Sequence, residues 1–138
     1  MKYMILTYGS QQDYEALTGQ QSGGRAWTQE EWAALATFMN AFNKELTDSG
    51  ELVEGRGLST PVHSRRVRLE GGAPVVTDGP YAESEEVLAG FWVVDCDGFD
   101  RATEIAARLT DCPGPEENRA RAYVDIRPID EHQPDFEG

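Results

Sequence analysis

The residues best suited to proton-transfer chemistry follow an apolar, strand-like run at 75–77. Asp78, Gly79 and Pro80 form a strong turn signal, and Glu83 comes three residues later. If Asp78 and Glu83 shared one low-dielectric cleft, the pKa of one carboxyl would rise while the other stayed ionised, which gives an acid–base pair. Alternatively, Asp78 caps its own turn and Glu83 accepts bonds from exposed backbone N–H groups. The sequence leaves both interpretations open.

His63 is a further candidate for proton transfer, because an unperturbed imidazole has a pKa near ~6.5. It follows Pro61 in a predicted loop. A histidine in such a place is often an ordinary surface residue. His63 is therefore either a general base that assists Asp78 and Glu83 or a residue with no chemical role.

Arg65, Arg66 and Arg68 form the basic cluster of an otherwise acidic chain. A planar guanidinium group suits recognition of carboxylate or phosphate, and strand alternation places Arg66 and Arg68 on the same face. These two arginines are candidate ligand-binding residues. The alternative is structural, with the arginines paired to Asp78, Glu83 or Glu85 across a hairpin.

Tyr8 and Tyr81 complete the candidate ligand-binding residues, with amphipathic packing as the alternative. No metal site is expected, because the two histidines are far apart and Cys96 and Cys112 lack metal-ligand spacing. The sequence contains no phosphate-binding loop, dinucleotide fingerprint or nucleophile elbow. We therefore expect no cofactor.

Composition limits the class of protein. The chain has 138 residues, 39% of them hydrophobic, and a formal net charge of -13. This charge opposes binding to nucleic acid or to anionic lipid. No stretch approaches the ~20 apolar residues of a membrane span, and the first eight residues are too few for a signal-peptide core. A soluble, cytoplasmic protein is expected.

The elements that position these residues alternate between strands and helices. Thr28 and Glu31 have capping-box spacing at the start of the longest helix, which carries an apolar stripe interrupted at Asn43. Gly71 and Gly72 provide a hairpin turn. We predict strands at 2–8, 51–59, 64–69, 73–77, 88–96 and 122–129, helices at 27–49 and 99–109, and a helical turn at 82–87. The inward face of the second helix is expected to consist of Ala102, Ile105, Ala106 and Leu109. Gly55, inside its strand, indicates a bulge or the close approach of another backbone or a ligand.

This order predicts an α+β, ferredoxin-like domain at 1–129 with an inserted β-hairpin, followed by an acidic tail at 130–138. The loop at 18–26 is expected to be a flap. The helices cover one face of the sheet. The other face must also be covered, since Phe91 or Trp92 would otherwise be in water. A homodimer that packs these faces together, a dimeric α/β barrel, is the simplest solution.

The start M-K-Y-M-I-L-T-Y-G and the central run V-T-D-G-P-Y-A-E-S-E-E-V-L-A-G-F-W-V-V-D resemble the DGPF-type branch of the YCII-related proteins. The resemblance extends from Lys2 to Ile129 and includes the final strand A-Y-V-D-I-R-P-I. It implies a ferredoxin-like subunit, a dimeric α/β barrel, and a cleft between sheet and helix or at the dimer interface.

The resemblance implies little about activity, because most members have none assigned. Some lie beside sigma factors in bacterial genomes, which suggests a sigma factor as a possible protein partner. Certain members are thought to use a first-helix histidine with an aspartate, but this chain has Met39 at the histidine position. Glu85 also replaces a lysine common in the DGPF motif, which makes the region more negative.

Two functions remain. The first is binding of a small molecule or a partner protein through a cleft near the Asp-Gly-Pro-Tyr motif. The second is a cofactor-independent lyase or isomerase that transfers protons through Asp78 and Glu83. The missing helix histidine favours the first.

Overall fold

The computed structural model describes residues 1–17 and 27–132. Over these ranges the chain forms six strands, four α-helices and one 3-10 helix. The predicted flap at 18–26 and most of the predicted tail, 133–138, lie outside the described residues. In chain order the elements are β1 (Lys2–Gly9), α1 (Gln11–Leu17), α2 (Gln29–Ser49), β2 (Leu52–Gly57), η1 (Pro61–His63), β3 (Arg65–Glu70), β4 (Ala73–Asp78), β5 (Val87–Asp95), α3 (Phe99–Leu109), α4 (Glu116–Arg121) and β6 (Val124–Pro128).

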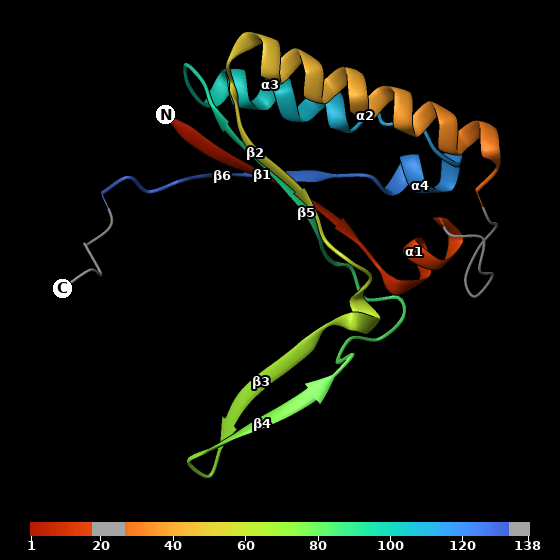
Figure 1. Ribbon diagram of the computed structural model, residues 1–138, viewed down its shortest axis with the longest axis vertical. Helices are drawn as coiled ribbons and strands as arrows, with labels where there is room; N and C mark the ends of the chain where they lie inside the picture. Colours follow the sequence, from red (N-terminus) through yellow and green to blue (C-terminus); the bar gives the residue numbers. More distant parts are fainter. Residues whose placement is uncertain (18–26, 133–138) are drawn as a thin grey trace.

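The main sheet has four antiparallel strands in the order β2-β5-β1-β6. The two long helices, α2 and α3, run across one of its faces (Figure 1). This is an α+β arrangement consistent with the predicted ferredoxin-like fold. Among the described residues, no helix has the length and apolar character needed to cross a membrane.

Helix α2 begins at Gln29, two residues later than predicted and directly after the predicted cap Thr28, and it ends at Ser49 as predicted. The Thr28 hydroxyl accepts the Glu31 N–H at 3.1 Å, and Glu31 Oε1 accepts the Thr28 N–H at 2.9 Å. This confirms the capping box, which satisfies N–H groups that have no partner within the helix. At the other end Gly50 has a φ of 79°, a left-handed conformation that glycine adopts without steric cost.

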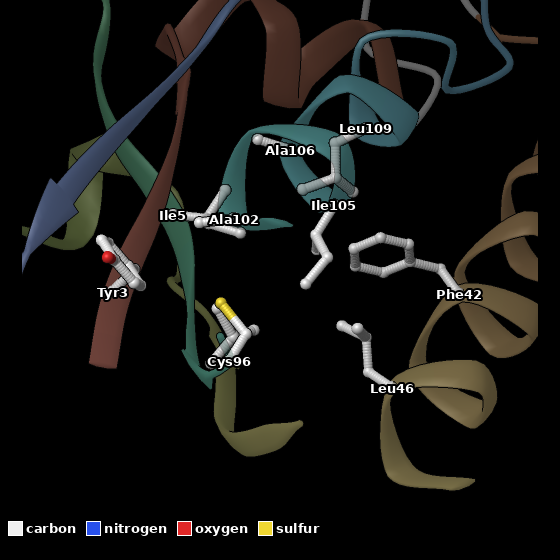
Figure 2. Close-up of a cluster of buried hydrophobic side chains, with 10 residues drawn as sticks. Tyr3, Ile5, Phe42, Leu46, Cys96, Ala102, Ile105, Ala106 and Leu109 are labelled. Atoms are coloured by element: carbon white, nitrogen blue, oxygen red, sulfur yellow. The ribbon is translucent and has the colours of Figure 1, made fainter. Parts of the chain in front are cut away.

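The core lies between the helices and the sheet (Figure 2). Phe42 and Leu46 extend from α2 toward Ile105 of α3, and all three are almost fully buried. The inward face predicted for α3 is confirmed. Its buried residues are Ala102, Ile105, Ala106 and Leu109.

Strand alternation divides β1 and β5 between the two faces of the sheet. Tyr3 and Ile5 join the core, as does Trp92, whose ring meets Phe42 edge-on with centroids 5.6 Å apart. Met4, Leu6, Phe91 and Val93 therefore lie on the face opposite the helices, where Leu6 pairs with Phe91 and Met4 with Val93. We call these four residues the open-face cluster.

Strands β3 and β4 form a two-stranded sheet of their own that extends away from the helical layer (Figure 1). Gly71 and Gly72 have φ values of 57° and 82°, as a two-residue hairpin turn requires. Val67 and Val76 are register partners, and both are more than half exposed. The hairpin thus presents apolar side chains to solvent.

Two local predictions differ from the structure. Helix α4 was not predicted, although its first turn is acidic and its last turn contains Arg119 and Arg121, which suits the helix dipole. The preceding Pro-Gly-Pro run masked this signal. The helical turn expected at 82–87 is a single turn, with the Glu85 N–H bonded to the Ala82 carbonyl at 3.0 Å, before the chain enters β5.

Candidate functional site: a cavity between sheet and helices

A cavity of about 330 Å³ lies where β1 and β5 meet the helices. Residues from α1, α2, α3 and α4 also contribute to its wall. The register of β1 against β5 shifts between Thr7 and Tyr8, and both residues line the cavity. Such a bulge bends a strand and redirects its side chains, and bulges are common beside functional sites.

Most of the wall is apolar. Trp27, Met39, Trp92, Leu109 and Val124 all line the cavity. These side chains come from the segment before α2, from α2 itself, from β5, from α3 and from β6. The same helix–sheet packing that makes the core therefore shapes this wall. Such a surface favours an apolar ligand body.

One end of the cavity is polar. Arg121 Nη2 lies 3.4 Å from Asp13 Oδ1, and Arg121 Nη1 lies 3.9 Å from Glu86 Oε1. The hydroxyl of Tyr123 donates to Glu86 Oε2 at 2.9 Å. The side chains of Glu86 and Arg121 are 35% and 54% exposed, so this end of the cavity reaches solvent. We call Asp13, Glu86, Arg121 and Tyr123 the polar rim.

Tyr8 and Tyr123 stack beside this rim, with ring centroids 5.2 Å apart and planes at 21°. The Tyr8 hydroxyl donates to Asp125 Oδ2 at 2.7 Å. This hydrogen bond, together with burial and the carboxylate charge, raises the pKa of Tyr8 to about 12. The bond to Glu86 likewise raises the pKa of Tyr123. Both phenols are therefore neutral hydrogen-bonding groups near neutral pH.

Two further polar groups line the cavity. Within the described part of the chain, the buried Nε1 of Trp27 has no hydrogen-bond partner, which is a costly state for a buried donor. Burial raises the pKa of the Cys112 thiol to about 11. Because the thiolate is the nucleophilic form, Cys112 is suited to packing rather than to reaction.

The carboxylates predicted for proton transfer lie elsewhere. Asp78 ends β4, where its Oδ1 accepts a 2.7 Å bond from Arg65 Nε, and its side chain is 74% exposed. Glu83 is exposed, and its backbone carbonyl accepts the Gln12 N–H at 3.1 Å. His63 ends η1 and is also exposed. None of these three proposed catalytic residues lines the cavity, and their catalytic role stays a prediction.

The predicted ligand-binding residues separate into two groups. Tyr8 lines the cavity, whereas Tyr81, Arg66 and Arg68 do not. The Arg66 guanidinium lies 5.2 Å from the centroid of the Tyr81 ring, a cation–π contact. Arg68 Nη2 lies 2.6 Å from Glu70. The structural pairing considered for the arginine cluster is thus found in the Arg65–Asp78 pair.

The polar rim was not predicted, for identifiable reasons. Arg121 belongs to α4, which was not predicted either, and Glu86 is one of several acidic residues that follow the Asp-Gly-Pro turn. Met39 was considered at the position of the family's histidine, and it does line the cavity. In the described ranges, no group of three or more His, Cys, Asp or Glu residues could hold a metal ion.

Comparisons with known proteins extend over nearly all of the fold. A family model for the YCII-related domain matches residues 1–123. An uncharacterized protein of Rhizobium meliloti (strain 1021) is 27% identical over 134 residues, which is 97% of this chain and 96% of that protein. The family match includes strands β1 to β5, helices α1 to α4 and Tyr123, and it ends just before β6. With three of the four strands of the main sheet, the four helices and the polar rim inside the matched region, the chain belongs to the YCII-related domain family.

Proposed function

We propose that this YCII-related protein binds a small, mostly apolar molecule in the cavity between the sheet and the helices. The observation that carries the proposal is the cavity itself. Its volume of about 330 Å³ is within the range typical of small-molecule sites. Its apolar wall and single polar rim match the usual division between groups that give affinity and groups that fix orientation.

The residues of the cavity favour binding over catalysis. Met39 occupies the position that the family resemblance assigns to a histidine, and a thioether cannot transfer a proton. The phenols of Tyr8 and Tyr123 hold their protons near neutral pH because Asp125 and Glu86 accept their hydrogen bonds. A lyase or isomerase that uses Asp78 and Glu83 is the alternative. It predicts turnover that Asp78→Asn abolishes.

A neutral fluorescent probe tests the binding proposal. N-phenylnaphthylamine gains fluorescence in apolar surroundings, so the folded chain should enhance its emission with a saturable curve. Met39→Trp places a larger side chain in the cavity and should reduce the enhancement at least about tenfold, since overfilled sites exclude ligands. Thr37→Trp is the matched control, because Thr37 is exposed on the same helix.

The two variants separate the cavity from other apolar surfaces. Loss of the signal in Met39→Trp and its retention in Thr37→Trp support the proposal. Equal signals in both variants would show that the probe binds elsewhere, for example on the open-face cluster, and would reject the cavity as the site. Circular dichroism of both variants checks that the fold is intact.

We also propose that two copies associate through the open-face cluster, which gives the closed α/β barrel expected from the resemblance. Met4, Leu6, Phe91 and Val93 form an apolar centre on the face opposite α2 and α3, where Met4, Leu6 and Phe91 are partly exposed and Val93 is only 8% exposed. Two apolar faces gain free energy when they exclude water together. A symmetric dimer is the commonest closed assembly.

Light scattering coupled to size exclusion tests this association. The native chain should elute with about twice its mass of 15.3 kDa. Leu6→Lys places a charge in the apolar centre and should yield a monomer, whereas Thr37→Lys on the exposed side of α2 should remain a dimer. A monomeric native chain at micromolar concentration contradicts the proposal. Membership of the DGPF-type branch, a sigma-factor partner and a cytoplasmic location stay predictions.

A further inference from the structure

We infer that the cavity selects a molecule with a ring-sized apolar body and a positively charged amino group, and discriminates against the matching carboxylate. This inference rests on the proposed binding function and adds the charge class of the ligand. Three independent features support it: the charges of the polar rim, the neutral state of the other polar groups, and the aromatic character of the wall.

The charges of the rim are unbalanced. Asp13 and Glu86 contribute two carboxylates, and Arg121 contributes one guanidinium, which leaves one net negative charge. Among the described residues that line the cavity, Arg121 is the only basic side chain. It already lies 3.4 Å from Asp13 and 3.9 Å from Glu86. An incoming carboxylate would have to compete with both acidic groups for this single cation.

An incoming amine meets the opposite situation. Each carboxylate oxygen can accept two hydrogen bonds. The 3.9 Å separation between Glu86 Oε1 and Arg121 is an ion pair beyond hydrogen-bond length, so this oxygen retains accepting capacity toward a ligand. An ammonium group at the rim would therefore gain a charge-assisted bond to Glu86 without displacing the Tyr123 hydroxyl from Oε2.

The other titratable groups of the wall do not reverse this balance. Tyr8, Tyr14 and Tyr123 remain protonated phenols, because burial or a neighbouring carboxylate raises the pKa of each. The pKa of Cys112 is about 11, so its thiol is neutral too. Arg119, on the same helix as Arg121, is 3.0 Å from Asp111. The whole chain carries -13, and a negative potential raises the local concentration of cations at a cleft.

The wall itself favours a cation. Five of the residues that line the cavity are aromatic: Tyr8, Tyr14, Trp27, Trp92 and Tyr123. The face of an aromatic ring carries negative partial charge, so it attracts ammonium groups and repels carboxylates. Aromatic rings are also the groups by which proteins recognise quaternary ammonium ligands.

Three indoles of similar size test the charge class. Tryptamine carries an ammonium group, tryptophol a neutral hydroxyl and indole-3-acetate a carboxylate on the same ring system. Each is titrated against the full chain by calorimetry at low ionic strength and used to displace N-phenylnaphthylamine. Tryptamine should bind at least about tenfold more tightly than indole-3-acetate, with tryptophol between them, and added salt should narrow this ratio.

A pair of variants assigns the preference to the rim. Glu86→Gln should lower the affinity for tryptamine and raise the affinity for indole-3-acetate. It should leave the affinity for tryptophol within about twofold, because only the charge has changed. Glu85→Gln is the matched control, since Glu85 is adjacent and exposed but does not line the cavity. Equal effects of the two variants would assign the preference to the net charge of the chain and overturn the inference.

The outcomes separate this inference from the function on which it rests. Two results would show that the charge class is wrong while the binding function stands. In the first, indole-3-acetate binds as tightly as tryptamine. In the second, the native chain binds N-phenylnaphthylamine and Met39→Trp does not, but none of the three indoles displaces the probe. If the probe also binds Met39→Trp as well as the native chain, the binding function fails and the inference fails with it.

Discussion

The indole Nε1 of Trp92 donates a 2.9 Å hydrogen bond to Oδ1 of Asn43. This bond joins the central strand β5 to helix α2 beside the cavity, and it explains the one polar residue in the helix's apolar stripe. Asn43 provides the acceptor that a partly buried indole needs. The ring of Trp92 is also held edge-on by Phe42. Trp92 is therefore fixed in orientation where it lines the cavity.

Asn43→Ala should lower the free energy of unfolding by about 1–3 kcal/mol, because it leaves the Trp92 N–H without its acceptor. Urea denaturation monitored by circular dichroism measures the change. Asn40→Ala is the control, since Asn40 is exposed on the same helix and gains the same helix propensity. Equal stabilities of the two variants would show that the bond contributes nothing to the fold.

Much of the fold could be predicted because local patterns and tertiary packing agree. The capping box at Thr28, the turn at Gly71 and Gly72 and the buried face of α3 each have a short-range signal that the structure confirms. Gly55 shows a subtler agreement. A glycine within a strand indicates close approach of another group, and a Cβ at Gly55 would lie 3.1 Å from the Trp92 ring.

The cavity could not be predicted in the same way, because its wall is assembled from residues distant in sequence. Asp13 and Arg121 meet across 108 positions, and Glu86 and Tyr123 across 37. Short-range patterns favoured Asp78 and Glu83, since acidic residues after a turn are conspicuous. Asp78 instead pairs with its hairpin neighbour Arg65. Spacing alone does not reveal which acidic residue of a run faces the interior.

The stability of the folded chain at acidic pH should depend on Glu51. Its hydrogen bonds to Arg101 at 2.9 Å lower the pKa of the Glu51 carboxyl, and the side chain is only 16% exposed. A lowered folded pKa adds stability that is complete above the unfolded value of ~4.3 and is lost as pH falls through the folded pKa. Glu51→Gln should therefore be less stable than the native chain near neutral pH, with the difference shrinking below about pH 4.

Denaturation midpoints measured across this acidic range test the prediction for Glu51. Glu104→Gln is the matched control, because Glu104 pairs with the same Arg101 at 3.1 Å but is 68% exposed. Solvent screens such a pair, so its removal should change the acid profile little. A constant difference between Glu51→Gln and the native chain at every pH would contradict the assignment.

The ionisation of Tyr8 should depend on Asp125. The raised pKa, about 12, arises first from the bond to the Asp125 carboxylate, so Asp125→Asn should move the Tyr8 pKa back toward ~10. A pKa that is higher in the folded chain than in the unfolded chain stabilises the fold fully below the unfolded pKa. This stabilisation is lost as the pH rises through the folded pKa. Carbon NMR of the tyrosine ring measures the titration. Glu86→Gln should instead lower the pKa of Tyr123 and shift that of Tyr8 less than Asp125→Asn does, so equal shifts of Tyr8 in the two variants would contradict the assignments.

Gly114 should be needed for the position of Trp27 in the cavity wall. A Cβ at Gly114 would lie 2.9 Å from Cη2 of Trp27 and 3.2 Å from Cζ2, closer than carbon atoms tolerate. Because an indole ring is rigid, Gly114→Ala must move the whole ring. Overpacking of this kind costs about 1–3 kcal/mol, and it should also weaken N-phenylnaphthylamine binding.

Gly57→Ala is the control, since nothing lies within 4 Å of a Cβ there. The loss of backbone freedom in its unfolded chain should make it neutral or stabilising by up to about 1 kcal/mol. Probe affinity that falls in Gly114→Ala and persists in Gly57→Ala would connect the Trp27 ring to the binding site, whereas equal affinity in both would remove Trp27 from it.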